Sequence, residues 1–158
     1  MKLYFETTMF NYYFDDDRDG HIDTVRLFEA VRNGKHEAYT SIYTLGELED
    51  AQEPKRSQML ALIDEYNITV LPITNESNHL TNLYVTKNIV PDRFRIDGAH
   101  IGIACIYGLD YILSYNFKHI NRAKIKLLTG RINQEQGYGT SVICTAKEVL
   151  EDETDEEC

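Results

Sequence analysis

Three carboxylates stand where chain segments are expected to begin or end, and their oxygens are of the kind that bind hard metal ions. Glu6 follows an apolar run expected to be a strand, Glu47 lies in an expected helix, and Asp97 is expected to open another helix. Oxygen ligands suit Mg²⁺ and Mn²⁺, and Mg²⁺ usually keeps several waters while taking one or two carboxylates and substrate phosphates. The same positions are also compatible with plainer roles, since a strand-end acid can form a surface ion pair and Asp97 can cap a helix.

Further polar side chains leave a later expected strand. Ser114 and Asn116 follow that strand, and Asn116 offers either an amide donor or a carbonyl oxygen unless it simply forms a turn. The carboxyl ends of parallel strands meet at one edge of a sheet, where open α/β folds bind their ligands. We therefore expect Asn116 and the three carboxylates to form one site.

Other familiar kinds of site are not supported by the sequence. His100 and His119 have no metal-ligand spacing to another His or Cys, so each is expected to be hydrogen-bonded and partly buried. The hydroxyl residues near the acids have no recognisable His partner, and the sequence contains no G-x-S-x-G, P-loop or G-x-G-x-x-G motif. Three tyrosines near the acids are candidates for stacking on a nucleic-acid base: Tyr12, Tyr13 and Tyr115.

Length and composition indicate an ordinary globular protein. The 158 residues suffice for one compact domain, and no apolar run approaches the roughly 20 residues needed to cross a membrane. The N-terminal MKLYFETTMF lacks the pattern of a signal peptide, so a cytoplasmic protein is expected. The three cysteines are widely spaced and form no CxxC pair, which argues against a disulfide framework and a structural zinc site.

The charge balance is acidic, with a formal net charge of −10. Phosphate binding normally requires basic surface, so this charge runs against a nucleic-acid partner. Six of the acids lie in 151–158, which we expect to be a disordered acidic tail after a domain at 1–150; without them the net charge is −4. A divalent ion bound by carboxylates would also reverse the local sign.

The order of expected elements predicts a single three-layer α/β/α domain. Short apolar strands are expected at 2–5, 37–40, 68–71, 111–113 and 142–144. Helical periodicity and capping residues predict helices at 21–33, 42–50, 54–63, 75–87, 97–107 and 121–136, with a short helix from 145. The aromatic segment 10–14 is expected to be a link. Strands separated by helices favour a central parallel sheet of about five strands, covered on both faces.

Four stretches of the sequence together resemble a PIN domain. They are LYFETT at 3–8, the acid Glu47, DGAHIGIA at 97–104 and YILSYNFKHI at 111–120, the last two being the specific part. The resemblance extends in length and element order over nearly the whole chain, and it is to stand-alone PIN proteins related to VapC-type toxins. It implies a metal-dependent ribonuclease in which Glu6, Glu47 and Asp97 hold Mg²⁺ or Mn²⁺.

The resemblance also implies roles for the other polar residues and for partners. Asn116 would orient a water or the phosphate, Thr7 and Ser114 would donate supporting hydrogen bonds, and Lys118 and His119 would attract the RNA backbone. By analogy with the toxins, a small antitoxin protein would be a partner and the chain would form a homodimer.

Two positions depart from the family pattern, because Glu6 and Asn116 stand where members usually have Asp. The Asn is shared by a subgroup with the same NFKH stretch, whereas Glu is one methylene longer and Mg²⁺ demands near-ideal octahedral geometry. An alternative is therefore a PIN-like RNA-binding or protein-interaction module with weakened catalysis. A small-molecule phosphatase ranks last, since it would need an Asp nucleophile where Glu6 stands.

Overall fold

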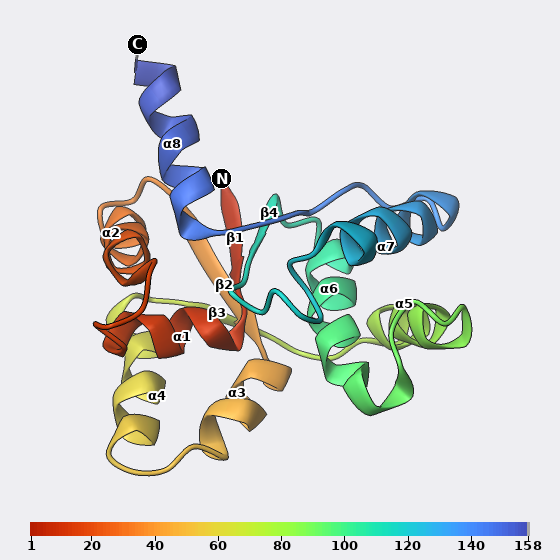
Figure 1. The fold of residues 1–158 in the computed structure, drawn as a ribbon, viewed down its shortest axis with the longest axis horizontal. Helices are drawn as coiled ribbons and strands as arrows, with labels where there is room; N and C mark the ends of the chain where they lie inside the picture. The colour runs from red at the N-terminus through yellow and green to blue at the C-terminus, as the bar shows by residue number, and fades with distance from the viewer. Residues whose placement is uncertain (158) are drawn as a thin grey trace.

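A five-stranded parallel sheet forms the middle layer of the protein (Figure 1). The structure is a computed structural model that describes residues 1–157, with side chains through Thr154. The strands stand in the order β3-β2-β1-β4-β5, with bounds β1 Lys2–Phe5, β2 Glu37–Ser41, β3 Thr69–Leu71, β4 Tyr111–Leu113 and β5 Val142–Cys144. Leu3 pairs with Ala38 on one side and Tyr111 on the other. The carboxyl end of β1 therefore lies between those of β2 and β4.

Helices cover both faces of this sheet, as the expected three-layer fold requires (Figure 1). One layer contains α1 Thr7–Phe14, α2 His21–Arg32, α4 Lys55–Glu65 and α8 Ala146–Glu157. The other contains α5 Asn75–Thr86, α6 Arg95–Ile106, preceded by the 3₁₀ helix η1 Asp92–Phe94, and α7 Ala123–Glu135. Helix α3, Ile42–Glu49, directly follows β2 at the carboxyl edge of the sheet. No helix among the described residues is long and apolar enough to cross a membrane.

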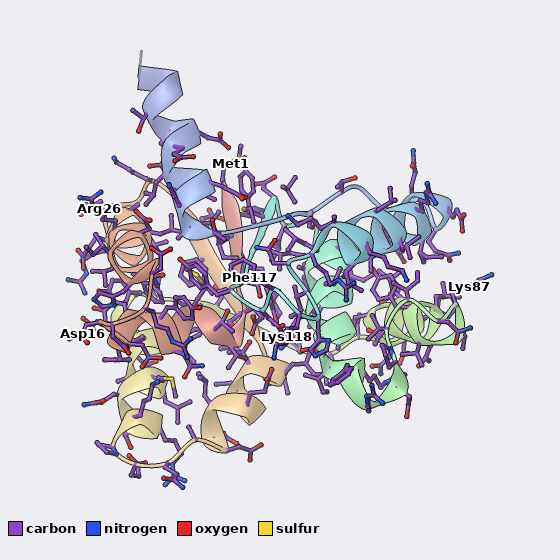
Figure 2. All side chains as sticks on the ribbon, in the orientation of Figure 1. Met1, Asp16, Arg26, Lys87, Phe117 and Lys118 are labelled. Carbon is purple, nitrogen blue, oxygen red and sulfur yellow. The ribbon has the colours of Figure 1, made fainter. Side chains whose placement is uncertain are left out.

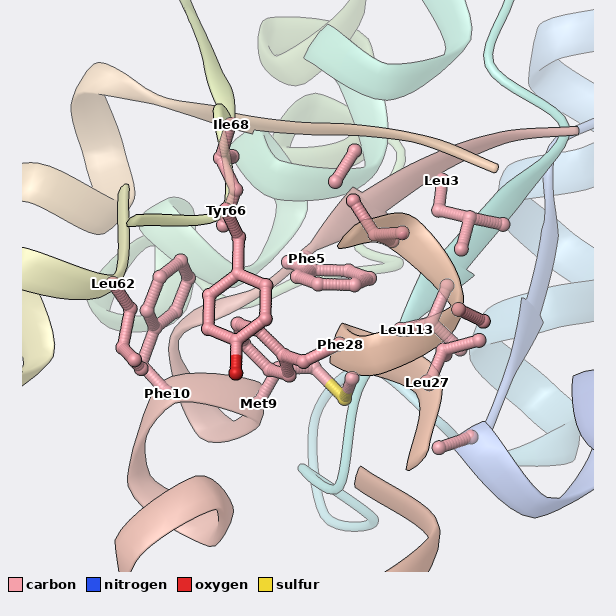
Figure 3. Close-up of a cluster of buried hydrophobic side chains, with 14 of the residues drawn as sticks. Leu3, Phe5, Met9, Phe10, Leu27, Phe28, Leu62, Tyr66, Ile68 and Leu113 are labelled. Carbon is pink, nitrogen blue, oxygen red and sulfur yellow. The ribbon is translucent and has the colours of Figure 1, made fainter. Parts of the chain in front are cut away.

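The central strand β1 is buried on both faces, because each layer of helices covers one of them. Leu3 and Phe5 belong to one core cluster and Tyr4 to the other, as the alternation of side chains along a strand requires. In the first cluster the Phe5 and Phe28 rings lie 4.8 Å apart, and Tyr66 packs against Phe28 (Figure 3). Burying one such aromatic side chain stabilises the fold by about 1.5–3 kcal/mol. The core thus fixes the strand that carries Glu6 at its end.

The segment 10–14 is helical, so the expectation of an irregular link was wrong. It forms the second half of α1, whose N-cap is Glu6; the carboxylate of Glu6 accepts a hydrogen bond from Thr8 N. Met9 and Phe10 point into the core from this helix. Tertiary burial of these side chains outweighs the modest helix propensity of the aromatic run.

Helix α6 begins at Arg95, two residues before the predicted start. Phe94 is its N-cap, and Asp97 lies within the first turn. A carboxylate in the first turn is favoured by the partial positive charge of a helix N-terminus. Asp97 is therefore not the helix cap that the plainer interpretation suggested.

The acidic stretch 151–158 differs from the expected disordered tail over its described part. It continues α8 as far as Glu157, and His36 Nε2 contacts the Glu153 carboxylate. Cys158 lies outside the described residues. The acidic stretch is thus joined to the domain by helix α8 and by one polar contact.

Candidate active site

The predicted site residues all come from segments at the carboxyl edge of the sheet. Glu6 follows β1, Asn116 follows β4 and Glu47 lies in α3 after β2. Asp97 reaches the same region from the first turn of α6. The structure therefore brings the four together as the parallel-sheet rule predicts.

Glu6 is held by three hydrogen bonds and is only 3% exposed. Its Oε2 accepts from Thr8 N at 3.1 Å, and its Oε1 accepts from Thr8 Oγ1 at 2.9 Å and from Ser114 Oγ at 2.6 Å. Ser114 reaches it from the end of the neighbouring strand β4. The carboxylate thus joins the end of β4 to the start of α1.

Asn116 turns its amide group toward Asp97. Its Nδ2 donates to Asp97 Oδ1 at 3.4 Å, while its Oδ1 accepts from His119 N at 3.0 Å. Its backbone N donates to Ser114 Oγ at 3.0 Å. The side-chain nitrogen of Asn116 thus faces the acids, and its side-chain oxygen fixes the loop through His119 N.

The carboxylates are close enough to influence one another. Burial raises the pKa of Asp97, the positive charges of His100 and His119 oppose this rise, and the negative charges of Glu47 and Glu6 add to it. The net pKa of Asp97 lies above its ordinary value. A cation among these groups would relieve both the repulsion and the burial penalty.

Glu47 is paired with a residue that the sequence analysis did not assign to the site. Its Oε1 accepts from Thr7 Oγ1 at 3.0 Å and lies 2.6 Å from His100 Nε2. Burial would raise the pKa of Glu47, but the hydrogen bond and charge of His100, with the Thr7 hydroxyl, lower it below its ordinary value. Burial would likewise lower the pKa of His100, but Glu47, Glu6 and Asp97 raise it. Thr7 thus makes the supporting contact predicted for it, and His100 joins the site.

His100 is fully buried, rather than partly buried as expected from the sequence. Its Nδ1 lies 2.6 Å from the Tyr4 hydroxyl, so both ring nitrogens are used. One signal was present in the sequence: His100 follows Asp97 by three residues, and helical residues three apart lie on the same side. Its contact with Glu47 joins residues 53 positions apart and had no local signal.

Two predicted RNA contacts lie beside the site on the segment after β4. Lys118 is exposed next to Phe117, between the two layers of helices as seen in Figure 2. The His119 ring stacks on Phe94 at 3.9 Å, and the Arg93 guanidinium lies 4.9 Å from the centre of the Phe94 ring. A cationic and aromatic surface thus lies next to Asn116.

The three tyrosines suggested for base stacking are engaged within the protein. Tyr12 and Tyr115 stack on each other at 3.9 Å, and the Tyr115 hydroxyl lies 2.8 Å from Thr24 Oγ1. Tyr13 shares a hydrogen bond with Tyr66 in the first core cluster. These rings thus already have ring or hydroxyl partners inside the fold, and base stacking by them stays a prediction.

The carboxylate oxygens of the candidate site are chemically suited to binding a hard cation such as Mg²⁺. Among the described residues no group of three His, Cys, Asp or Glu side chains is already arranged to hold a metal ion. Mg²⁺ does not require such a cage, since one or two carboxylates, waters and substrate phosphate suffice. Asp97 and the second oxygen of Glu47 would be available as such carboxylate ligands, since that Glu47 oxygen has no hydrogen-bond partner among the described residues.

Comparison with known proteins identifies the fold. No protein-family model matches the chain, and no curated protein matches its sequence. The VapBC2 structure of Rickettsia felis bound to a promoter DNA fragment matches with a TM-score of 0.55 and 10% identity, over 92% of this chain and 98% of that one. VapC20 of Mycobacterium tuberculosis, a Sarcin-Ricin loop cleaving toxin, matches with a TM-score of 0.51 and 14% identity, over 74% and 92%. This chain has the PIN-domain fold.

The PIN fold agrees with the resemblance that the sequence motifs suggested. The PIN sheet positions Glu6 and Asn116 through β1 and β4, and its helices α3 and α6 position Glu47 and Asp97. His100 is an addition to this set on α6.

Proposed function

We propose that the protein is a metal-dependent endoribonuclease that hydrolyses RNA phosphodiester bonds. The observation that supports this best is the convergence of Glu6, Glu47 and Asp97 at the carboxyl edge of a PIN fold, where burial, with a smaller contribution from the charges of Glu47 and Glu6, raises the pKa of Asp97. Neighbouring carboxylates with a perturbed pKa are typical of functional sites, and a bound cation would relieve their repulsion.

Each residue has a role in this proposal. Asp97 and Glu47 would hold Mg²⁺ or Mn²⁺, with Glu6 completing the acidic set. When bound, the ion would lower the pKa of a water and neutralise charge on the scissile phosphate. The Asn116 amide, which donates to Asp97, would orient a water or the phosphate, and Ser114 would keep Glu6 in place.

The structural neighbours support the proposed substrate and partner classes. VapC20 is a toxin that cleaves the Sarcin-Ricin loop, and the VapBC2 structure contains a DNA fragment from its promoter. We extend to this chain RNA as substrate, a small antitoxin protein as partner and assembly as a homodimer. The cationic segment around Lys118 would attract the RNA backbone despite the acidic net charge.

The test compares Asp97→Asn with Asp64→Asn, which changes an exposed acid on α4. With Mn²⁺ and a labelled RNA, the cleavage rate of Asp97→Asn should fall at least about 100-fold, whereas the cleavage rate of Asp64→Asn should be unchanged. Full cleavage by Asp97→Asn would contradict the assignment.

The second candidate is a PIN-like RNA-binding or protein-interaction module that has lost catalysis. It is favoured by the hydrogen bonds that already occupy Glu6 and by the pairing of Glu47 with His100. Titration calorimetry separates the two candidates, because no binding of Mg²⁺ or Mn²⁺ at millimolar concentration would support the second.

A further inference from the structure

A chain of buried hydrogen bonds leads from the core to Glu47. Ser41 Oγ lies 2.7 Å from the Tyr4 hydroxyl, which lies 2.6 Å from His100 Nδ1, and His100 Nε2 lies 2.6 Å from Glu47 Oε1. Ser41, Tyr4 and His100 are each 0% exposed. The chain thus connects β2, β1 and α6 to one carboxylate on α3.

The last hydrogen bond has a defined direction. A carboxylate oxygen only accepts hydrogen bonds, so His100 Nε2 carries a proton and donates it to Glu47 Oε1. Thr7 Oγ1 donates to the same oxygen. One oxygen of Glu47 is therefore fixed by two donors, and the other keeps its capacity to bind a further group.

We propose that His100 is a positioning residue, which acts through Glu47 by fixing this carboxylate with one oxygen left free. The consequence for a metal ion rests on the proposed function, whereas the arrangement of the hydrogen bonds does not.

The helix pattern around His100 does not require a polar side chain at this position. Its neighbours on α6, Ile101, Ile103 and Ala104, are buried and apolar, so an apolar side chain would fit the helix pattern. A buried imidazole has to be hydrogen-bonded on both nitrogens to avoid a large penalty, and here one nitrogen is directed at Glu47.

Glu47 is the group that gains from this contact. Its side chain is 40% exposed and sits on α3, so without a partner it would be free to change rotamer. Hydrogen-bonding partners of metal-ligating carboxylates typically contribute 10–100-fold to metal affinity. We expect His100 to contribute at the lower end of that range.

Two variants of His100 form a matched pair. His100→Gln keeps an amide at the position of Nε2, within reach of Glu47, whereas His100→Asn places the same amide one methylene short, near Tyr4. Both leave a polar group in the core, so their losses of stability in urea unfolding should be similar. They differ in which contact they keep, because His100→Gln retains a donor for Glu47 and His100→Asn retains a polar group beside Tyr4.

The first measurement is the affinity for Mn²⁺ by electron paramagnetic resonance. His100→Asn should bind Mn²⁺ about tenfold more weakly than the unmodified protein, and His100→Gln should stay within about threefold of it. Equal weakening in both variants would show a structural role only. Unchanged or tighter binding by His100→Asn would overturn the proposal, and tighter binding would show that His100 competes with the metal.

The second measurement needs no metal and no substituted His100. Proton NMR of the ¹⁵N-histidine-labelled, metal-free protein should show an Nε2 proton on His100 that exchanges slowly with water. This signal should move upfield in Glu47→Gln, because a charged acceptor is replaced by a neutral one. A signal that does not move, or an Nε2 without a proton, would overturn the proposal. Absence of Mn²⁺ binding by the unmodified protein would refute the metal-dependent function, and the NMR result would then decide the role of His100 alone.

Discussion

Glu6 performs two tasks at one position. It caps α1 by accepting from Thr8 N, and it joins β4 by accepting from Ser114 Oγ. An Asp here could still cap α1, but it would be one methylene shorter while its backbone is fixed by β1, so it would have less reach toward Ser114 Oγ. The longer side chain at this position thus has a structural use in this chain.

Ser114 supports this arrangement through a buried hydroxyl that both donates and accepts. Ser114→Ala leaves Asn116 N without its acceptor and removes one donor from Glu6, so we expect a loss of about 1–3 kcal/mol in the free energy of unfolding. Urea denaturation measures it. Ser57→Ala, which removes an exposed hydroxyl bound to Glu53, should cost less than about 0.5 kcal/mol. Equal losses in the two variants would show that the contacts of Ser114 contribute no more to the free energy of unfolding than those of an exposed serine.

The two described thiols should be unreactive in the native protein. Burial raises the pKa of Cys105 to about 11 and that of Cys144 to about 12, the latter helped by the charge of Glu148. Only the thiolate reacts, so at pH 8 a Cys158→Ser variant should react slowly with a thiol reagent, and rapidly in urea, where both thiols regain a pKa of about 8.5. Rapid native labelling of either thiol would contradict the packing of the sheet against α6 or α8.

The residue types of the site could be predicted from the sequence, but not all of their contacts. Glu6, Glu47 and Asp97 could be predicted from the sequence because the carboxyl ends of parallel strands meet at one edge of a sheet. The contact of His100 with Tyr4 spans 96 positions and depends on how α6 lies on β1. No periodic pattern in the sequence indicates a contact between residues so far apart in the chain.

At the scale of elements, the five strands and most helices were predictable from apolar runs, glycines and capping residues. Helix α1 was not, because its cap is a Glu and its sequence is aromatic. Ser, Thr, Asp and Asn are the usual caps, and aromatic runs favour strands. The helix forms because Met9 and Phe10 are buried in the core, which is a tertiary effect.

The packing of α6 on α5 depends on Gly102, where the two helices approach closely. A Cβ at Gly102 would lie 3.0 Å from Thr81 Oγ1, so Gly102→Leu should destabilise the fold by about 1–3 kcal/mol through overpacking. Gly130 on α7 has open space around it, so Gly130→Ala should stabilise by about 0.5–1 kcal/mol through helix propensity. Urea unfolding measures both. A stable Gly102→Leu variant would show that α6, which carries Asp97, is not tightly fixed by α5.

At the scale of the whole molecule, the charge is strongly uneven. The segment 111–134 contains five of the sixteen cationic residues and none of the twenty-six acids, so the rest of the chain has a net charge of −15. This segment includes β4, the loop with Asn116 and most of α7. A phosphate backbone would therefore meet cations beside the candidate site and acids elsewhere, which restricts where RNA can approach.

Within that segment, Phe117 is 55% exposed beside Lys118. The loop that presents them is fixed by hydrogen bonds, among them Asn121 N to the Asn116 carbonyl at 2.8 Å and Asn121 Nδ2 to the Ser114 carbonyl at 2.9 Å. An aromatic ring next to a cation suits an unpaired base and its phosphate. The loop is thus the place where RNA contacts should be measured.

Lys118→Gln tests this charge distribution through RNA binding, measured in a variant that is expected not to cleave the RNA. In the Asp97→Asn background, affinity for a single-stranded RNA should fall as salt rises, and Lys118→Gln should reduce the slope of log K against log salt by about 0.7, the value for one phosphate contact. Lys87→Gln removes the same charge at the far end of the molecule (Figure 2) and should leave the slope unchanged. Fluorescence anisotropy at several salt concentrations measures both. Equal effects of the two substitutions would mean that RNA responds only to net charge, because a bound phosphate responds to the cation it contacts and not to a distant one.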